Sequence, residues 1–192
     1  MTVKERVQLL EDVTWYVKAD LSHGFRHFGT HPKDWRYQVY CNGYNEHYID
    51  LACPFGKTNS TLEFCPPVAL FAKSVATRYR TEVQGPVAKL GSYVDDIFGG
   101  LTNDHSYNRA MTFLQHLCRA GIRLTLEFNM QPHKTPPPAR KQVILGNLYD
   151  SVHRRVCTAE KKRSKYINKI AQTLPLTFMP LTDLQKLHGY LN

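Results

Sequence analysis

The sequence has 192 residues, of which 42% are hydrophobic, and a formal net charge of +9 at pH 7. This length supports one domain with a sizeable core, and the hydrophobic content excludes a disordered chain. No stretch approaches the roughly 18 consecutive apolar residues that a membrane span needs, so we expect this basic chain to bind nucleic acid rather than a membrane.

The cysteines indicate a reducing compartment. They are Cys41, Cys53, Cys65, Cys118 and Cys157. Their number is odd, no Cys-x-x-Cys pair is present, and no apolar signal-peptide core follows Met1. These features predict an intracellular protein, in the cytoplasm or the nucleus, whose thiols are reduced.

A short helix and a strand are predicted first. Apolar residues recur at helical spacing at Val3, Val7 and Leu10. Residues 15–21 then have the composition of a strand, and Asp20 stands at its end. A carboxylate is thus expected at the end of the predicted strand.

A hairpin follows. Residues 36–41 and 44–52 are two strand-like runs, and Asn42-Gly43 joins them. Asn-Gly between such runs is the strongest short-range signal for a β-hairpin.

The next element is a helix that begins near residue 60. Ser60 and Glu63 have capping-box spacing, and apolar residues continue one helical face beyond them. Pro66-Pro67 lies inside this pattern, and proline removes a helical hydrogen bond and clashes with the preceding turn. The sequence therefore predicts a break or a late start at the two prolines.

Residues 91–100 place two adjacent carboxylates between short apolar arms. Glycines bound the stretch, which predicts a tight hairpin with Asp95 and Asp96 at its tip. Two like charges side by side repel each other, and a divalent cation bound by oxygen ligands removes that cost. The alternative is an ordinary solvated turn, to which aspartate is also suited.

Three segments complete the chain. Apolar residues at helical spacing predict a helix from residue 107 that ends near Gly121, and residues 122–128 alternate as in a strand. A basic helix begins near Thr158 and carries lysines beside an apolar stripe. These lysines either lie along a phosphate backbone or form a solvated helix face, and both interpretations remain open.

Several of these stretches resemble the motifs of reverse transcriptases, in the same order. Asp20 to Phe25 resembles motif A, Pro54-Phe55-Gly56 with Ser60 beyond it resembles motif B, and Tyr93-Val94-Asp95-Asp96 resembles motif C. Downstream, Lys134 resembles the lysine of motif D, and Leu145-Gly146 resembles the primer-grip turn of motif E. The resemblance covers residues 13–192 and is closest to the polymerases of retroelements, in particular the tyrosine-recombinase, DIRS-like branch.

The resemblance implies an α+β fold: a polymerase palm, in which an antiparallel sheet has helices packed on one face, plus part of the fingers. Its implied domains are the start of the palm (1–27), a partial fingers hairpin (28–53), the palm (54–157) and the truncated start of a thumb or connection (158–192). The missing fingers and thumb regions are expected in the same polyprotein. We therefore expect this fragment to be inactive when alone.

The implied function is RNA-directed DNA synthesis, with an RNA or DNA template, a DNA primer and a deoxynucleoside triphosphate as partners. The implied catalytic residues, which would also hold two Mg²⁺ or Mn²⁺ ions, are Asp20, Asp95 and Asp96. The implied nucleotide-binding residues are Phe25, Pro54, Phe55, Gly56 and Lys134. The implied primer- and template-binding residues are Tyr93, Leu145, Gly146, Lys161 and Lys165. Phe25 would be the aromatic gate that excludes a ribose 2′-hydroxyl.

Two other functions compete with polymerisation. The first is an idle, reverse-transcriptase-derived module that only binds nucleic acid or a structural partner. The presence of three acids speaks against it, because carboxylates without a metal are expected only to repel each other. The second is another palm-type nucleotidyl transferase or cyclase, against which Pro54-Phe55-Gly56 and Phe25 argue.

Overall fold

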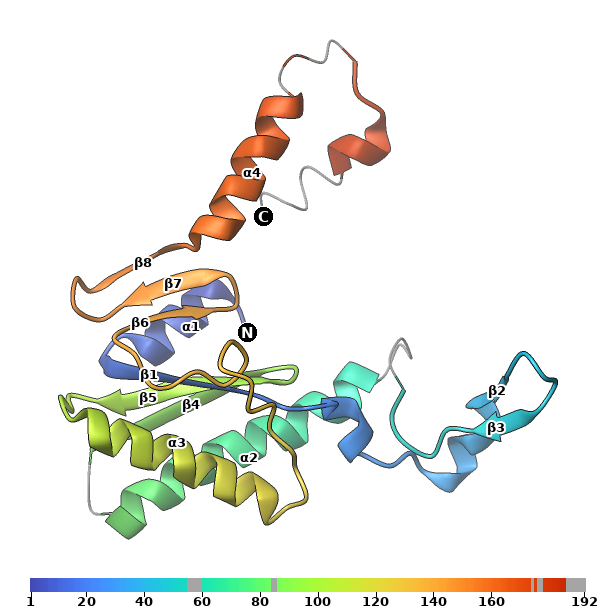
Figure 1. Ribbon diagram of the computed structural model, residues 1–192, viewed down its shortest axis with the longest axis horizontal. Coiled ribbons are helices and arrows are strands. Elements are labelled where there is room, and N and C mark those ends of the chain that lie inside the picture. The colour runs from blue at the N-terminus through green and yellow to red at the C-terminus, as the bar shows by residue number, and fades with distance from the viewer. Residues whose placement is uncertain (55–59, 84–85, 174, 176–177, 186–192) are drawn as a thin grey trace.

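The computed structural model describes residues 1–192 except 55–59, 84–85, 174, 176–177 and 186–192. A central antiparallel sheet has the strand order β1-β5-β4, from β1 (Val13–Asp20), β5 (Asp96–Thr102) and β4 (Ala88–Tyr93). Two long helices, α2 (Ser60–Val83) and α3 (Tyr107–Ile122), cover one face of this sheet (Figure 1). The expected α+β architecture, an antiparallel sheet with helices on one face, is confirmed.

The main core lies between the central sheet and these two helices. Alternate residues of β1 point into it, and Val17 and Ala19 are fully buried there. Phe64 and Val68 of α2 and Phe113 and Leu117 of α3 supply large apolar side chains from the other side. Because strand side chains alternate between faces, Tyr16, Lys18 and Asp20 point to the opposite face of β1.

A second antiparallel sheet and a short helix cover part of that opposite face. The second sheet contains β6 (Lys141–Ile144), β7 (Asn147–Asp150) and β8 (Arg155–Thr158), and the helix is α1 (Val3–Leu10). Their apolar side chains form a smaller cluster with the central sheet: Leu10, Val13, Tyr16, Phe98, Ile144 and Tyr149. The Asp20 end of β1 lies beyond the residues of this cluster.

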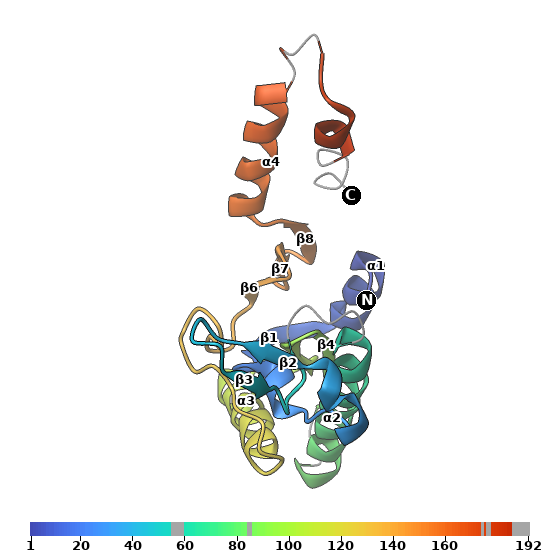
Figure 2. The ribbon, with the colours of Figure 1, turned by 90° about the vertical axis from the view of Figure 1, so that its right-hand side faces the viewer.

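A projecting hairpin and a C-terminal helix extend from this body (Figures 1 and 2). The hairpin pairs β2 (Val39–Cys41) with β3 (His47–Ile49), as the Asn42-Gly43 signal predicted, and all its strand residues are exposed. Its strands are shorter than predicted, because residues 32–37 form a 3₁₀ turn instead. Helix α4 (Glu160–Thr173) follows the second sheet and has no buried residue.

Two predicted features of the helices and strands are wrong. Helix α2 runs without interruption through Pro66 and Pro67, because the residues on either side, Phe64 and Val68, are fully buried in the core and hold the turn in place. Residues 122–128 do not form a strand: Ile122 ends α3, residues 123–125 form a turn, and Phe128 makes one isolated β-bridge, to Leu21. Within the described residues, none of the helices is both long and apolar enough to cross a membrane.

Candidate active site

Strand pairing brings the predicted acids together. Asp20 ends β1, Asp96 begins β5, and the two residues are directly paired across the strands. Directly opposed residues of an antiparallel pair present their side chains on the same face. The backbone N–H of Leu21 also donates to the carbonyl oxygen of Asp95 at 2.9 Å. Motif A and motif C, which are distant in the sequence, therefore meet at one end of the central sheet.

Asp95 lies in a tight turn between β4 and β5. Tyr93 pairs with Asp96, so that Val94 and Asp95 alone form the connection. Val94 has a φ of 54°, a left-handed conformation that is costly for a β-branched residue. The local packing of the hairpin therefore maintains a strained backbone next to Asp95.

The loop that follows Asp20 packs against this turn. A Cβ atom placed on Gly24 would lie 2.8 Å from Cζ of Phe64 and 3.2 Å from Cβ of Asp95. Any side chain at Gly24 would consequently press on both the Phe64 ring and Asp95. Glycine at this position lets the motif A loop approach the motif C turn closely.

The three carboxylates influence one another electrostatically. Burial raises the pKa of Asp95, and the charges of Asp20 and Asp96 raise it further, while Lys134 acts in the opposite direction. Ionised Asp95 is thus less stable here than in water. A cation bound beside it would relieve both the burial and the repulsion.

Two lysines pair with the other acids. The Nζ atom of Lys134 lies 3.3 Å from Oδ2 of Asp20, and the Nζ atom of Lys18 lies 3.1 Å from Oδ1 of Asp96. The loop that carries Lys134 is fixed next to β1, because the Asp20 N–H donates to the Thr135 hydroxyl at 3.3 Å. The family resemblance identified Lys134, and the structure brings it to Asp20. Sequence reasoning missed Lys18, although the two-residue strand repeat places it on the same face as Asp20.

These ion pairs correct one argument drawn from the sequence. The acids were expected to repel one another in the absence of a metal, and that repulsion was used against a non-catalytic role. Lys18 and Lys134 instead offset the charges of Asp96 and Asp20. The presence of the three acids is therefore compatible with either role.

Among the residues that the structure describes, no three or more His, Cys, Asp or Glu side chains are arranged to hold an ion. Mg²⁺ is, however, commonly bound by one or two carboxylates together with substrate phosphates and water. Asp20 and Asp95 fit that kind of shared site, since Asp95 forms no ion pair with any described residue and its environment disfavours an uncompensated charge.

The predicted nucleotide-pocket residues lie in or next to motif A, in the loop before α2, or outside the described residues. Phe25 is 7% exposed, and its ring packs against that of Phe64 with centroids 4.5 Å apart. The carbonyl oxygen of Pro54 accepts a hydrogen bond from the Ser60 hydroxyl at 2.8 Å. Phe55 and Gly56 lie outside the described residues. Phe25 is thus part of the core, and its role as a sugar gate stays a prediction.

The predicted primer-binding residues fall into two groups. Tyr93 is 46% exposed at the end of β4, and Asp96 of β5 pairs with both Tyr93 and Asp20, so that β5 lies between them. Leu145 and Gly146 form the turn between β6 and β7, with φ values of 49° and 79°. The Ala159 N–H donates to the Gly146 carbonyl oxygen at 3.0 Å, which fixes the turn to the start of α4. Lys161 and Lys165 are exposed on that helix.

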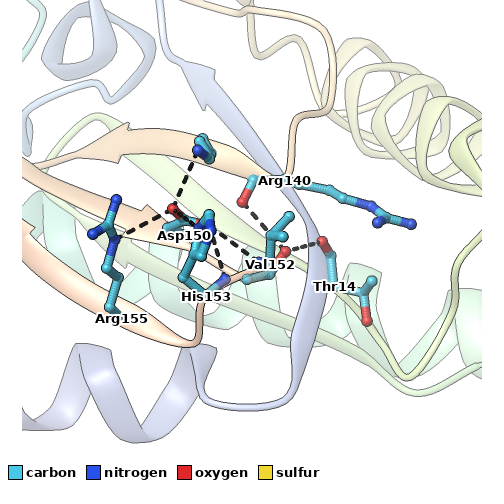
Figure 3. A network of polar contacts seen from close by, with 8 residues as sticks. Thr14, Arg140, Asp150, Val152, His153 and Arg155 are labelled. Atoms are coloured by element: carbon cyan, nitrogen blue, oxygen red, sulfur yellow. Dashed lines mark hydrogen bonds and ion pairs between the residues drawn. The ribbon is translucent and has the colours of Figure 1, made fainter.

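A buried carboxylate organises the second sheet (Figure 3). Oδ2 of Asp150 lies 2.8 Å from Nδ1 of His153 and 3.4 Å from both Nζ of Lys141 and Nε of Arg155. Burial alone would raise the pKa of Asp150, but the side-chain and backbone hydrogen bonds from His153 and the charges of His153 and Lys141 lower it well below its usual range. No sequence pattern pointed to this network.

The same network attaches the second sheet to β1. The Ser151 hydroxyl donates to the carbonyl oxygens of Thr14 at 2.6 Å and Arg140 at 3.2 Å.

Residues 140–169 contain nine Lys and Arg but only two Asp and Glu, and one of those two is the buried Asp150. Most of the net positive charge is consequently concentrated on the second sheet and α4.

Comparison with known proteins supports the fold. No family model and no curated protein sequence matches the chain. A foamy viral protease-reverse transcriptase in complex with double-stranded DNA superposes with a TM-score of 0.70 and 14% identity, over 99% of this chain and 29% of that chain. A foamy viral protease-reverse transcriptase in complex with an RNA/DNA hybrid gives a TM-score of 0.71 and 15% identity, over 97% of this chain and 22% of that chain. The chain thus spans about a third or less of the proteins it matches, and it has a reverse-transcriptase-like fold.

Proposed function

We propose that this chain is the palm and part of the fingers of an RNA-directed DNA polymerase from a retroelement of the DIRS-like branch. The observation that carries the proposal is the meeting of Asp20 and Asp95 at one end of a sheet whose fold is reverse-transcriptase-like. The domain limits proposed are those given by the motifs: 1–27, 28–53, 54–157 and 158–192. The remaining fingers and thumb would come from the same intracellular polyprotein.

The chemistry proposed is transfer of a nucleotidyl group to a primer 3′-hydroxyl. Such phosphoryl transfer depends mostly on positioning and on stabilising developing charge. Asp20 and Asp95 would hold Mg²⁺ or Mn²⁺, which when bound neutralises charge on the phosphates and the attacking oxygen. Lys134, whose Nζ atom lies 3.3 Å from Oδ2 of Asp20, would contact the phosphates of the incoming nucleotide. Phe25, Pro54, Phe55 and Gly56 would shape the pocket for its sugar and base.

Charge distribution supports the proposal that nucleic acid lies over the second sheet. The basic segment 140–169 presents Lys161 and Lys165 to solvent, next to the Leu145-Gly146 turn. Lysines neutralise phosphates and release the condensed counterions, which is the main source of sequence-independent affinity. We propose that a primer and its RNA or DNA template follow this surface towards Tyr93 and the acids.

The second candidate is a catalytically idle module that binds nucleic acid. The observation in its favour is that lysines already pair with Asp20 and Asp96, so that the fold tolerates the acids without an ion. This module would retain the basic surface and would lack primer extension.

Primer extension distinguishes the two candidates. The chain, with its flanking regions restored, is assayed on primed RNA and DNA templates with Mg²⁺ or Mn²⁺, and template binding is measured in parallel by fluorescence anisotropy. Asp95→Asn is expected to abolish extension while binding persists. Asp12→Asn is the matched control, because Asp12 is an exposed acid that pairs with Lys89 at 3.4 Å. Extension that survives Asp95→Asn removes the metal assignment, and a wild-type protein that binds without extending supports the idle module.

A further inference from the structure

Lys18 occupies an unusual position for a strand lysine. It lies two residues before Asp20 on β1, and the strand repeat puts both side chains on the same face. Its Nζ atom reaches diagonally across to Asp96, 3.1 Å from Oδ1, and the two side chains are only 17% and 21% exposed. A largely covered ammonium is costly unless it is paired, so this contact is a specific one.

Each carboxylate of the candidate site has a different environment. Oδ1 of Asp96 is buried and accepts no hydrogen bond from the described residues, so the Lys18 ammonium is the group that offsets its charge. Asp20 pairs with Lys134, whose side chain is more exposed, at 43%. Asp95 forms no ion pair with any described residue and is repelled by both other acids. The three acids are therefore not equivalent.

We infer that Lys18 is a positioning residue that holds Asp96 outside the ion site and limits how tightly the free protein binds divalent ions. This inference rests on the proposed polymerase function. With Asp96 engaged by Lys18, Asp20 and Asp95 are the two carboxylates left for an ion. One or two carboxylates bind Mg²⁺ weakly until substrate phosphates complete the shell. Lys18 thus makes ion binding depend on the arrival of the nucleotide.

Removal of Lys18 has two consequences that can be measured separately. Lys18→Met keeps the length of the apolar stem but leaves Asp96 unpaired, which adds repulsion and lowers the stability of the ion-free protein. It also frees the Asp96 carboxylate, whose charge then adds to those of Asp20 and Asp95 in attracting a dication. We expect Lys18→Met to bind divalent ions about tenfold more tightly than the wild type does, a change that Coulomb attraction at a partly screened protein site is large enough to produce.

The first test measures binding of Mn²⁺ to the ion-free full chain, with the free ion detected by electron paramagnetic resonance. The second test measures thermal unfolding with and without Mg²⁺. Lys18→Met is expected to tighten Mn²⁺ binding about tenfold and to gain more thermal stability from Mg²⁺ than the wild type does. Lys18→Arg keeps the charge and should resemble the wild type. Lys89→Met is the matched control, since it removes a lysine that pairs with Asp12 at the other end of the same sheet.

A double-mutant cycle tests whether Lys18 acts through Asp96. In an Asp96→Asn background, Lys18→Met should tighten Mn²⁺ binding by much less than tenfold. Equal effects in both backgrounds, or an unchanged affinity in Lys18→Met, would overturn the inference. If Lys18→Met fails to fold, the Lys18→Met/Asp96→Asn protein, which removes both charges, supplies the comparison with Asp96→Asn. If the wild type shows the expected Mn²⁺ pattern but does not extend primers once its flanking regions are restored, the proposed function is rejected and the ion-binding role of Lys18 stands.

Discussion

Asp95→Asn should stabilise the ion-free protein while it abolishes activity. Asparagine keeps the shape of the side chain but removes its charge, so the cost of burying that charge disappears together with the repulsion by Asp20 and Asp96. Like charges a few ångströms apart near a protein surface repel by on the order of 1 kcal/mol or more. A gain of about 1 kcal/mol raises the melting temperature of a chain of this size by about 2–4 °C.

The gain should depend on pH in a defined direction. The folded protein raises the pKa of Asp95, so the ionised side chain destabilises the fold at every pH above that folded value. The advantage of Asp95→Asn is therefore complete near pH 7. It falls as the pH is lowered through the folded pKa, because wild-type Asp95 then takes up a proton, and it vanishes below the unfolded value of about 4.

Calorimetric unfolding near pH 7 and near pH 4, in a chelating buffer, measures this difference. Saturating Mg²⁺ should reduce the advantage of Asp95→Asn, because a bound ion relieves the same repulsion in the wild type. The control Asp12→Asn should lose at most about 0.5 kcal/mol, since exposed ion pairs stabilise weakly. A destabilised Asp95→Asn protein near pH 7, or a gain that does not change with pH, would refute the idea that the three acids form one repulsive cluster.

Three further changes test other parts of the molecule. Phe25→Ala should relax discrimination against ribonucleotides, and it should lower the free energy of unfolding by about 3–5 kcal/mol because loss of the buried ring leaves a cavity. Competition between ribo- and deoxynucleotides in primer extension measures the discrimination. An unchanged ratio of the two incorporations contradicts the role of Phe25 as a gate. Lys161→Gln with Lys165→Gln should weaken template binding and lower the salt slope of log K by up to about 2, if each lysine meets a phosphate, and titrations at several salt concentrations check this. Asp150→Asn should destabilise the second sheet above pH 4, where wild-type Asp150 is ionised and paired. Because the folded protein lowers the pKa of Asp150, the difference in stability between the wild type and the variant should shrink as the pH falls through that folded pKa. Hydrogen exchange of the β6–β8 amides at several pH values measures this difference.

The sequence predicts most local elements correctly because their causes are local. Asn42 closes its hairpin through short-range hydrogen bonds, because its Oδ1 atom accepts from the N–H groups of Tyr44 and Glu46 at 2.9 and 3.1 Å. The tight hairpin at the acids is also present, but its turn is Val94-Asp95, Asp96 begins β5, and the glycines that were expected to bound the turn lie inside the two strands. The pairing of β1 with β5 has no such local cause. The expectation that Asp20 meets Asp95 came from the resemblance to reverse transcriptases, and no periodicity in the chain contains it.

The failures arise where tertiary contacts override a local pattern. Burial of Phe64 and Val68 outweighs two prolines in α2. Within the alternating residues 122–128, Leu124 is 61% exposed. The segment is held beside the residues that follow β1 by the Leu21–Phe128 bridge and by the hydrogen bond from the Ser22 N–H to the Glu127 carbonyl oxygen at 2.8 Å. The chain then turns and brings Lys134 to Asp20. The Lys18–Asp96 pair and the Asp150 network join residues whose proximity depends on strand register, which composition does not encode.

The coverage of β1 has a consequence for assembly. This strand is at the margin of the central sheet, and an open margin of eight residues would invite another chain to add a strand there. Tyr16 exchanges two backbone hydrogen bonds with Ala139, at 2.8 and 3.1 Å, and Asn129 donates to the carbonyl oxygen of Asp20 at 2.8 Å. The segment of residues 129–139, which brings Lys134 to Asp20, therefore also shields this strand from the addition of a strand by another molecule. Proteolytic cleavage between residues 129 and 139 should make the protein prone to aggregate.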